Sequence, residues 1–479
     1  MIAGSSPDES VIVVGAGPAG ATAARALAAA GVRVRLLDRA AFPRNKPCGG
    51  GISMRVVRRF PYLAAGLRRI ATHEIRRLYL EGPTGASTVI ESDEPAALMI
   101  RRVEFDALLV ALALEAGVDL VCGVDVIQAK QDVERVTLTA RDGRRFTAPV
   151  VIAADGVHSV IARRLGLNPG WAASSVALDM MEETPRDRLR DLDPSTLWVS
   201  YGYGQGFGIR DSGFEGGEAT TENAERTDCA VGRRRSVLDT RERDGASASA
   251  RGSGAPREVT NACPEGYAYI FPKRDHVNIG VGYVLSYFRS EIDDAPYDLQ
   301  RGFIDQLRRR GIVVGESARE HFTPYLIPVG GPLRTPGRGR VLLAGDAGGF
   351  VNGFTAEGIY YAMVSGELAA QAVVAARSQP ARLAAVYCRA CDHEIGGELR
   401  DSVLIQRYLF ADRRRIVRVI DGANRERTVT RLILDYAAGR RSYRAVRRAI
   451  LARSPLLGAR LAIERLKENI VGTRASHYH

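Results

Sequence analysis

The stretch VIVVGAGPAGATAARALAAAGVRVRLLDR (Val11–Arg39) is the most informative part of the sequence. Its continuous apolar start is typical of a parallel strand buried on both faces, and the glycines Gly15, Gly17 and Gly20 follow as G-x-G-x-x-G before an alanine-rich helix. Gly15 permits a tight turn, Gly17 lets backbone approach a pyrophosphate, and Gly20 lets the helix pack closely on the strand. Asp38, which ends a second apolar strand, is placed to bind ribose hydroxyls. The stretch predicts a dinucleotide site; the alternative is a glycine turn in an ordinary strand–helix–strand unit.

Composition and charge are those of a large globular enzyme. The chain has 479 residues, 46% apolar and 25% charged, which excludes wholesale disorder. The net charge of +12 is concentrated at one end, because residues 401–479 hold 18 Lys and Arg against 7 Asp and Glu. This indicates an anionic surface or partner for that end and argues against nucleic-acid binding by the body of the protein. The sequence shows no secretory signal and no run of about 18 apolar residues, and its cysteines are irregularly spaced. We therefore expect a reducing, cytoplasmic setting.

Two further passages resemble parts of a nucleotide site. Val150–Leu167 contains an apolar strand, then Asp155 and Gly156, then a helix. Met99–Val118 contains a helix with Arg102 at its start. In isolation, Asp155 could be a turn former and Arg102 a surface charge.

A third strand end completes the pattern. Arg340–Ala370 contains an apolar strand, then Gly345 and Asp346, then a glycine-rich turn and a helix. Together the passages resemble the FAD-dependent enzymes of the glutathione-reductase/aromatic-hydroxylase class. The resemblance implies that Asp346 bonds the ribityl chain and that Arg102 contacts the cofactor. It also implies that the helix after the Gly353–Ile359 turn aims its N-terminus at the flavin, where its dipole stabilises negative charge.

These passages predict bound FAD. The residues that we expect at the cofactor are Gly15, Gly17, Pro18, Ala19, Gly20, Asp38, Arg39, Cys48, Gly49, Gly50, Arg102, Val126, Asp155, Gly156, Gly345, Asp346, Gly353, Gly358 and Ile359. No metal site is expected, because Cys388, Cys391 and His393 lie on one predicted helix without a second ligand pair at the spacing that zinc requires.

A cysteine-containing loop and an aromatic strand carry a second resemblance. The loop AFPRNKPCGGGIS (Ala41–Ser53) has three consecutive glycines after Cys48, and the alternation of Tyr267, Tyr269 and Phe271 predicts one shared strand face. The two motifs resemble P-x-x-x-C-G-G and Y-x-W-x-F-P of the geranylgeranyl reductases. They are carried by Pro43, Cys48, Gly49 and Gly50 and by Tyr267, Phe271 and Pro272. Tyr269 departs from the family's tryptophan.

The resemblance implies an FAD-dependent reductase that saturates carbon–carbon double bonds of an isoprenoid chain by flavin hydride transfer. It implies a prenyl lipid or prenyl diphosphate substrate in a tunnel that includes Tyr267, Tyr269, Phe271 and Pro272. We expect Cys48 to line the reacting face as a catalytic donor or gate; the alternative is that it only packs in a tight loop.

The electron donor expected from the family is NADPH or a reduced ferredoxin. Lys46 and Lys273, half of the four lysines, lie in the two motifs and suggest contacts with a phosphate. The rival functions are an FAD-dependent monooxygenase or halogenase of the same fold, or a membrane-associated flavin electron carrier.

The expected fold class is α/β, with a Rossmann-like FAD-binding domain and its β-meander, an antiparallel-sheet substrate domain and a C-terminal helical segment. The FAD-binding domain is assigned to residues 1–60, 97–166 and 335–375. The substrate domain is assigned to residues 61–96 and 167–334, with a disordered insertion at 210–260. The basic helical region is assigned to residues 376–479. The basic amphipathic pattern of the last region is consistent with peripheral membrane contact or with a solvated helix face.

Overall fold

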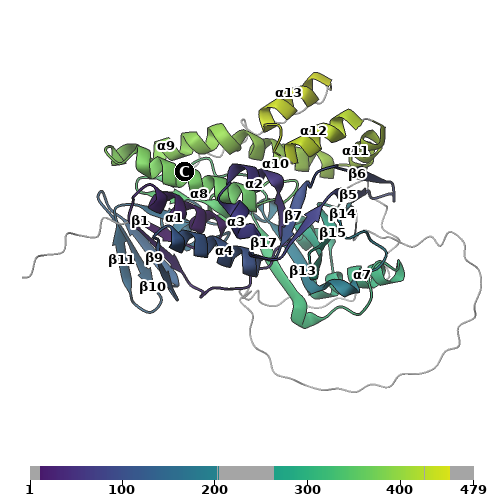
Figure 1. The fold of residues 1–479 in the computed structure, drawn as a ribbon, viewed down its shortest axis with the longest axis horizontal. Helices are drawn as coiled ribbons and strands as arrows, with labels where there is room; N and C mark the ends of the chain where they lie inside the picture. Colours follow the sequence, from purple (N-terminus) through teal and green to yellow (C-terminus); the bar gives the residue numbers. More distant parts are fainter. Residues whose placement is uncertain (1–10, 202, 204–263, 426, 438, 454–479) are drawn as a thin grey trace, which may run out of the picture. The chain divides into compact units, whose positions relative to one another are not determined.

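The computed structural model describes residues 11–201, 203, 264–425, 427–437 and 439–453 (Figure 1). These residues belong to one compact unit. The insertion assigned to residues 210–260 and the last part of the basic C-terminal region lie outside them.

A six-stranded sheet with the order β18-β19-β12-β1-β2-β8 forms the nucleotide-binding half. Its strands are β1 (Val11–Val14), β2 (Val34–Asp38), β8 (Asp119–Cys122), β12 (Val151–Ala153), β18 (Gly337–Arg338) and β19 (Val341–Leu343). All pairs are parallel except β18 with β19. The strands expected from the three apolar passages are therefore neighbours, and their carboxyl ends lie at one edge, where α/β proteins bind ligands.

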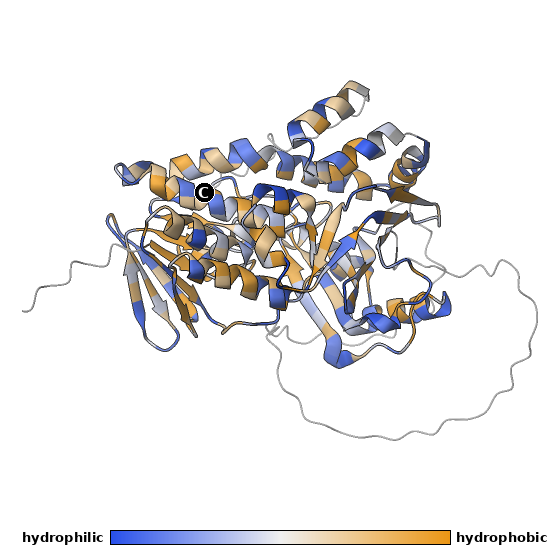
Figure 2. Cartoon of the chain, in the orientation of Figure 1, coloured by the Kyte–Doolittle hydropathy of each residue, from blue (hydrophilic) through white to orange (hydrophobic). Residues whose placement is uncertain are grey.

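Helices cover one face of this sheet and a β-meander covers the other. Val11 and Val13 pack against the helices α1 (Pro18–Ala29), α4 (Arg102–Glu115) and α8 (Ile359–Ala375). Ile12 and Val14 pack against β9 (Val126–Gln131), β10 (Val136–Ala140), β11 (Arg145–Ala148) and α5 (Val160–Arg164). Because both faces are covered, β1 is apolar throughout, as its sequence predicts (Figure 2).

The meander is shorter than the sequence predicted. The alternating pattern between Asp119 and Pro149 predicts meander strands over that whole stretch, but β8 at its start joins the parallel sheet beside β2. Leu120 and Val121 pair with Leu36 and Leu37, so the apolar pattern of β8 is used in the main sheet.

A second, seven-stranded sheet has the order β17-β13-β16-β15-β14-β5-β6. Its strands are β5 (Arg77–Glu81), β6 (Ser87–Glu91), β13 (Ala177–Pro185), β14 (Thr196–Tyr201), β15 (Gly266–Pro272), β16 (His276–Val284) and β17 (Phe322–Ile327). One face, with Trp198 and Ile270, packs against Phe303 of helix α7 (Pro296–Arg309). Tyr267, Tyr269 and Phe271 alternate with those core residues and lie on the opposite face, as predicted.

A small sheet connects the two halves. β3 (Gly51–Ser53) and β4 (Thr72–Ile75) both pair with β7 (Ala97–Ile100). The domain boundaries assigned at residues 60 and 96 therefore pass through one hydrogen-bonded sheet, so its strands cannot separate along them.

The described residues after 376 are mainly helical, as expected. Their helices are α9 (Leu383–Cys391), α10 (Gly397–Phe410), α11 (Arg413–Arg425), α12 (Arg427–Ala437) and α13 (Tyr443–Arg453), with a π-helical turn (Asp392–Gly396) before α10. Ile416 and Ile420 of α11 pack with Val199 and Tyr201 of β14. Within the described ranges, no helix is both long enough and apolar enough to cross a bilayer.

Candidate active site

A cavity of about 860 Å³ lies between the carboxyl ends of the parallel strands and the aromatic face of the seven-stranded sheet. All of the expected cofactor residues except Gly20 line it. Of the expected substrate residues, Tyr267, Tyr269 and Phe271 line it and Pro272 does not. The placement of Pro272 corrects the sequence interpretation: alternation along β15 turns it to the face opposite the three rings.

The glycine turn after β1 leaves no room for side chains at two of its positions. Gly15 has a φ of +95°, and a Cβ there would lie 2.2 Å from the Ala154 carbonyl oxygen. A Cβ on Gly20 would lie 1.8 Å from the Gly15 carbonyl oxygen, so Gly20 serves packing. At Gly17 the nearest atom would be Arg44 Nη2 at 3.6 Å, which leaves the backbone open towards the cavity.

Asp38 is held at the end of β2 by backbone donors. Its Oδ2 accepts a hydrogen bond from Ala16 N at 2.7 Å, and its Oδ1 accepts one from Ala40 N at 2.8 Å. The carboxylate therefore connects the glycine turn to the start of the cysteine-containing loop while it borders the cavity.

Asp155 carries an acceptor that lacks a partner among the described residues. Its Oδ2 accepts hydrogen bonds from Val160 N at 2.9 Å and Ile161 N at 3.3 Å, whereas its Oδ1 is buried without any bond. Burial raises the pKa of Asp155. Because an unsatisfied buried oxygen costs free energy, a donor on a bound ligand would stabilise this site, and a flavin dinucleotide with its hydroxyls fits that need.

The turn before α8 brings a helix N-terminus to the same cavity. Gly358 precedes α8, which has no side-chain cap, and both Gly358 and Ile359 line the cavity. Asn352 Oδ1 accepts bonds from the backbone N–H groups of Phe354 and Thr355, both at 3.0 Å. The free N–H groups of α8 suit a partial negative charge on a ligand, as the family resemblance implies.

Arg102 is a buried cation rather than the surface charge of the alternative interpretation. It forms two bonds with Asp106, at 2.7 and 2.8 Å, and hydrogen-bonds the Cys48 side chain. Burial opposes its charge, but the Asp106 carboxylate outweighs this and raises the pKa of Arg102. The guanidinium therefore fixes the loop at the cavity wall.

The cysteine-containing loop is clamped from three sides. Asn278 Nδ2 on β16 donates to the Cys48 carbonyl oxygen at 3.0 Å. A Cβ on Gly49 would lie 2.6 Å from the Phe271 ring, and one on Gly50 would lie 2.1 Å from the Ile100 carbonyl oxygen. The consecutive glycines therefore let backbone close on the sheet, and Cys48 borders the cavity.

The two motif lysines have different surroundings. Lys273 is 2% exposed, and its Nζ bonds Glu183 Oε2 at 2.9 Å and also Asn278. It anchors the loop and does not line the cavity, so the phosphate contact suggested for it is wrong. Lys46 does line the cavity, with its Nζ 5.0 Å from the centre of the Tyr325 ring, and burial lowers its pKa.

Sequence analysis missed a carboxyl group on the aromatic face. Asp179 of β13 is 5% exposed and borders the cavity. Tyr269 Oη donates to its Oδ2 at 2.9 Å, and Tyr325 hydrogen-bonds it as well. Burial raises the pKa of Asp179 to about 6, although these hydrogen bonds act in the opposite direction. The available sequence signal for Asp179 was a carboxyl group within the nine-residue strand β13. The pairing of that strand with its neighbours was needed to place Asp179 beside Tyr269.

The cavity lining includes a group of apolar side chains, some of them on the C-terminal helices, which we call the apolar arm. They are Leu78, Ile90, Leu197, Phe354, Phe410, Ile433 and Leu434. The Tyr201 and Phe354 rings stack with centroids 5.8 Å apart, beside Phe410. Helices α10 and α12, which the sequence assigned to a separate basic region, therefore contribute to the wall of this cavity.

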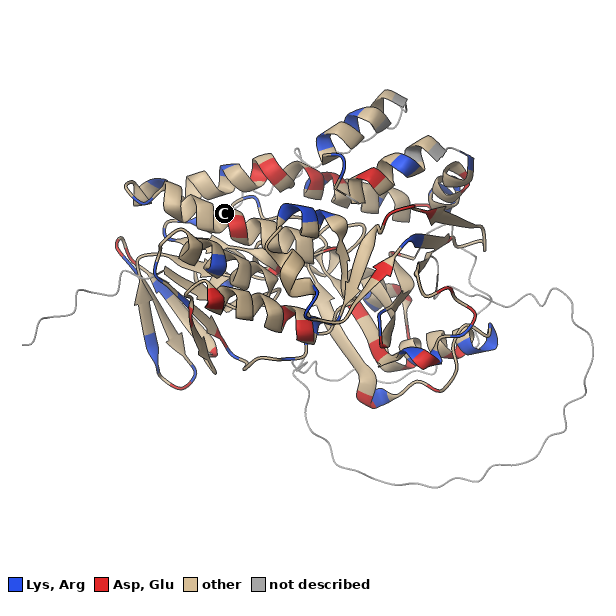
Figure 3. Ribbon diagram, in the orientation of Figure 1, with Lys and Arg blue, Asp and Glu red and all other residues tan. Residues whose placement is uncertain are grey.

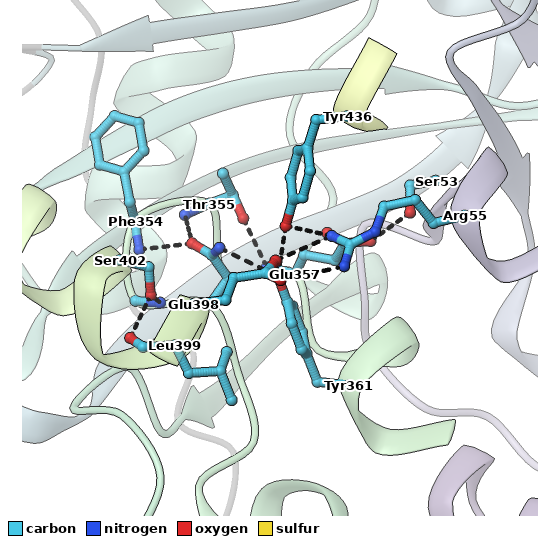
Figure 4. Close-up of polar contacts among 12 residues, drawn as sticks. Ser53, Arg55, Phe354, Thr355, Glu357, Tyr361, Glu398, Leu399, Ser402 and Tyr436 are labelled. Atoms are coloured by element: carbon cyan, nitrogen blue, oxygen red, sulfur yellow. Dashed lines mark hydrogen bonds and ion pairs between the residues drawn. The ribbon is translucent and has the colours of Figure 1, made fainter. Parts of the chain in front are cut away.

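A buried polar network joins that wall to the start of α8 (Figure 4). Arg55 of helix α2 (Met54–Arg59) bonds Glu398 of α10 at 3.0 and 3.3 Å. Tyr361 of α8 bonds Glu398, and Tyr436 of α12 accepts from Arg55. Ser53 Oγ donates to Glu357 Oε1 at 2.8 Å, beside the turn before α8.

A family model described as an FAD binding domain matches residues 8–209. This match and the reductase relatives identify an FAD-dependent oxidoreductase. A menaquinone reductase of Mycobacterium tuberculosis is 30% identical over 392 residues, which are 79% of this chain and 80% of the relative. Digeranylgeranylglycerophospholipid reductase 2 of Methanothermobacter thermautotrophicus is 26% identical, and the aligned region is 77% of this chain and 79% of that relative. The chain belongs to the geranylgeranyl reductase family of flavoproteins.

Solved structures share the fold. A geranylgeranyl bacteriochlorophyll reductase-like protein of Thermoplasma acidophilum has a TM-score of 0.69 and 18% identity, with 95% of this chain and 98% of that one covered. A flavin-dependent brominase has a TM-score of 0.64 and 17% identity, with coverages of 93% and 99%. At these identities, the structural matches establish the architecture alone.

Proposed function

We propose that this flavoenzyme saturates carbon–carbon double bonds of an isoprenoid chain carried by a prenyl lipid or prenyl diphosphate. The observation that carries the proposal is the apolar arm, whose residues line the same cavity as the nucleotide-binding turn and Tyr267. Apolar and aromatic side chains of this kind suit a long hydrocarbon. The relatives named as lipid and quinone reductases support the same substrate class.

In this proposal the chain holds and orients the reactants. The Gly17 turn and the N-terminus of α1 bind the pyrophosphate, Asp155 and Asp346 bind hydroxyls, and the N-terminus of α8 faces the flavin ring. Reduced FAD, when bound, supplies a hydride. Cys48 borders the reacting face as donor or gate, and the aromatic strand excludes water from the alkene.

An anaerobic titration tests this function. The purified holoenzyme is reduced with dithionite and mixed with a geranylgeranyl substrate, and flavin absorbance and product mass are followed. One saturated double bond should form for each reduced flavin that is reoxidised. A flavin that stays reduced while detergent-solubilised prenyl lipids, quinones and diphosphates are each supplied would contradict the proposal.

An oxygen-dependent reaction is the second candidate, because the brominase shares the architecture. Product that forms only when oxygen is admitted would support a monooxygenase or halogenase. Reduction of the flavin by NADPH and by a reduced ferredoxin, measured separately, identifies the donor. Flavin reduction that is never followed by turnover would favour an electron carrier.

A further inference from the structure

A row of residues crosses the cavity face of the seven-stranded sheet. Asp179 on β13 is paired with Tyr325 on β17 and with Gly282 on β16. Gly282 is paired in turn with Tyr267 on β15, which pairs with Tyr201 on β14. The carboxyl of Asp179 therefore lies in a row of tyrosines, and Asp179, Gly282, Tyr267 and Tyr325 of this row line the cavity.

Two glycines of β16 connect the carboxyl to Tyr269. A Cβ on Gly280 would lie 2.4 Å from Tyr269 Cζ and 2.5 Å from its Oη, so the ring lies over that glycine. A Cβ on Gly282 would lie 2.9 Å from Asp179 Oδ1. Without side chains at both positions, the Tyr269 hydroxyl reaches across β16 to Asp179, where it forms the 2.9 Å bond.

The charged and titratable groups that face Asp179 come from three elements. Tyr267 and Tyr269 belong to β15, Tyr325 belongs to β17, and Lys46 belongs to the cysteine-containing loop. Lys46 acts electrostatically with Asp179 and also with Asp346 at the nucleotide end. The tyrosine pKa values are raised well above their usual value, by burial first, so Asp179 is the stronger acid among them.

We propose that Asp179 is the proton source for saturation of the alkene and that the Tyr269 hydroxyl relays the proton. This inference rests on the proposed function. A hydride with its electron pair, supplied by reduced FAD, adds to one alkene carbon. In the structure the Tyr269 hydroxyl donates to Asp179; in the reacting state that hydroxyl turns to the alkene and the protonated Asp179 carboxyl donates across the same contact. The π electrons form a new C–H bond between the other carbon and the Tyr269 hydroxyl proton, while the Asp179 carboxyl proton passes to the Tyr269 oxygen. Asp179 is left as a carboxylate and regains its proton from water.

Single-turnover reoxidation of the reduced holoenzyme by geranylgeraniol in detergent, without oxygen, tests the relay. Asp179 must be protonated to act, so the wild-type rate should fall as the pH rises through about 6. Asp179→Asn and Tyr269→Phe should each slow the step by about 100-fold to about 10,000-fold and leave FAD affinity unchanged. Tyr325→Phe is the matched control, because it removes a hydrogen bond that favours the carboxylate form of Asp179. The pH at which the rate falls should therefore rise, and the rate at low pH should stay as fast as that of wild type.

The protein without flavin provides an independent readout. Its infrared spectrum should contain a protonated carboxyl band that titrates near pH 6 and disappears in Asp179→Asn. If wild type and Asp179→Asn react equally fast with geranylgeraniol, and their rates fall at the same pH, the relay is overturned. Cys48 then becomes the proton donor to test. If wild type is reoxidised neither by geranylgeraniol nor by any of the prenyl lipids, quinones and diphosphates of the anaerobic titration, the proposed function falls, and the relay falls with it.

Discussion

At the scale of single residues, Gly17 and Gly20 have different roles in one motif. We expect Gly20→Ala to destabilise the protein, because the added methyl group would overlap the Gly15 carbonyl oxygen. Gly17→Ala has space in the flavin-free protein and should fold normally, yet bind FAD at least about tenfold more weakly because the methyl group occupies the approach to the pyrophosphate. Thermal unfolding and flavin titration of both variants check this; equal FAD affinity of Gly17→Ala and wild type would contradict it.

Asp179 should make stability depend on pH. Its folded pKa of about 6 lies above the usual value of 3.8, so the folded state holds the proton more tightly than the unfolded state. Wild type should therefore lose stability relative to Asp179→Asn as the pH rises from about 4 to about 6. At about 1.4 kcal/mol per pH unit, the difference amounts to about 3 kcal/mol. Urea unfolding of both proteins across this range measures it, and a constant difference would show that the carboxyl does not titrate there.

Cys48 is the remaining candidate at the reacting face. If it takes part in turnover, Cys48→Ala should retain FAD and lose most of its alkene reduction, whereas Cys48→Ser should retain more because the hydroxyl keeps a proton. If Cys48 only packs in the loop, Cys48→Ala will retain both FAD and full activity. Flavin content and single-turnover product yield, measured on the same preparations, distinguish the two roles.

At the scale of elements, the Arg55–Glu398 pair connects α2, α8, α10 and α12 at the cavity wall, which Arg55 and Tyr436 themselves line. Arg55 is 9% exposed and Glu398 is 4% exposed. Glu398→Gln should cost about 3–5 kcal/mol of unfolding free energy, because it leaves the guanidinium buried without its carboxylate. The double variant Arg55→Met/Glu398→Met should recover much of that loss, since no charge remains unpaired. Chemical denaturation of the three proteins tests this, and equal losses in the single and double variants would contradict it.

At the scale of the whole molecule, the apolar arm includes Ile433 and Leu434 of α12, which contacts the basic helices α11 and α13. Arg414 and Arg418 of α11 and Arg444 and Arg448 of α13 are exposed. Lys and Arg recur along the C-terminal helices (Figure 3). If the enzyme takes substrate from a membrane, these arginines should bind an anionic surface, each with about 1 kcal/mol. Sedimentation with phosphatidylglycerol vesicles should therefore exceed that with phosphatidylcholine and fall with salt, and Arg414→Gln/Arg418→Gln should weaken it. Equal sedimentation with both lipids would contradict membrane docking.

Much of the nucleotide-binding half could be predicted from the sequence, because its signals are local. An apolar run followed by spaced glycines specifies a strand, a tight turn and a helix within one short stretch. The alternation of Tyr267, Tyr269 and Phe271 specified a shared face for the same reason. The predictions for Pro272, Lys273 and β8 were wrong for a different reason. Each depended on the sheet face that the residue occupies, or on the strand that pairs with it, in the folded chain.

The sequence by itself determined the FAD-binding architecture and the glycine turn, since backbone sterics and hydrophobic period act over a few residues. Only the tertiary structure placed Asp179 beside Tyr269, 90 positions apart, and α12 on the cavity wall. Strand order and register decide such contacts, and they depend on the packing of the whole chain.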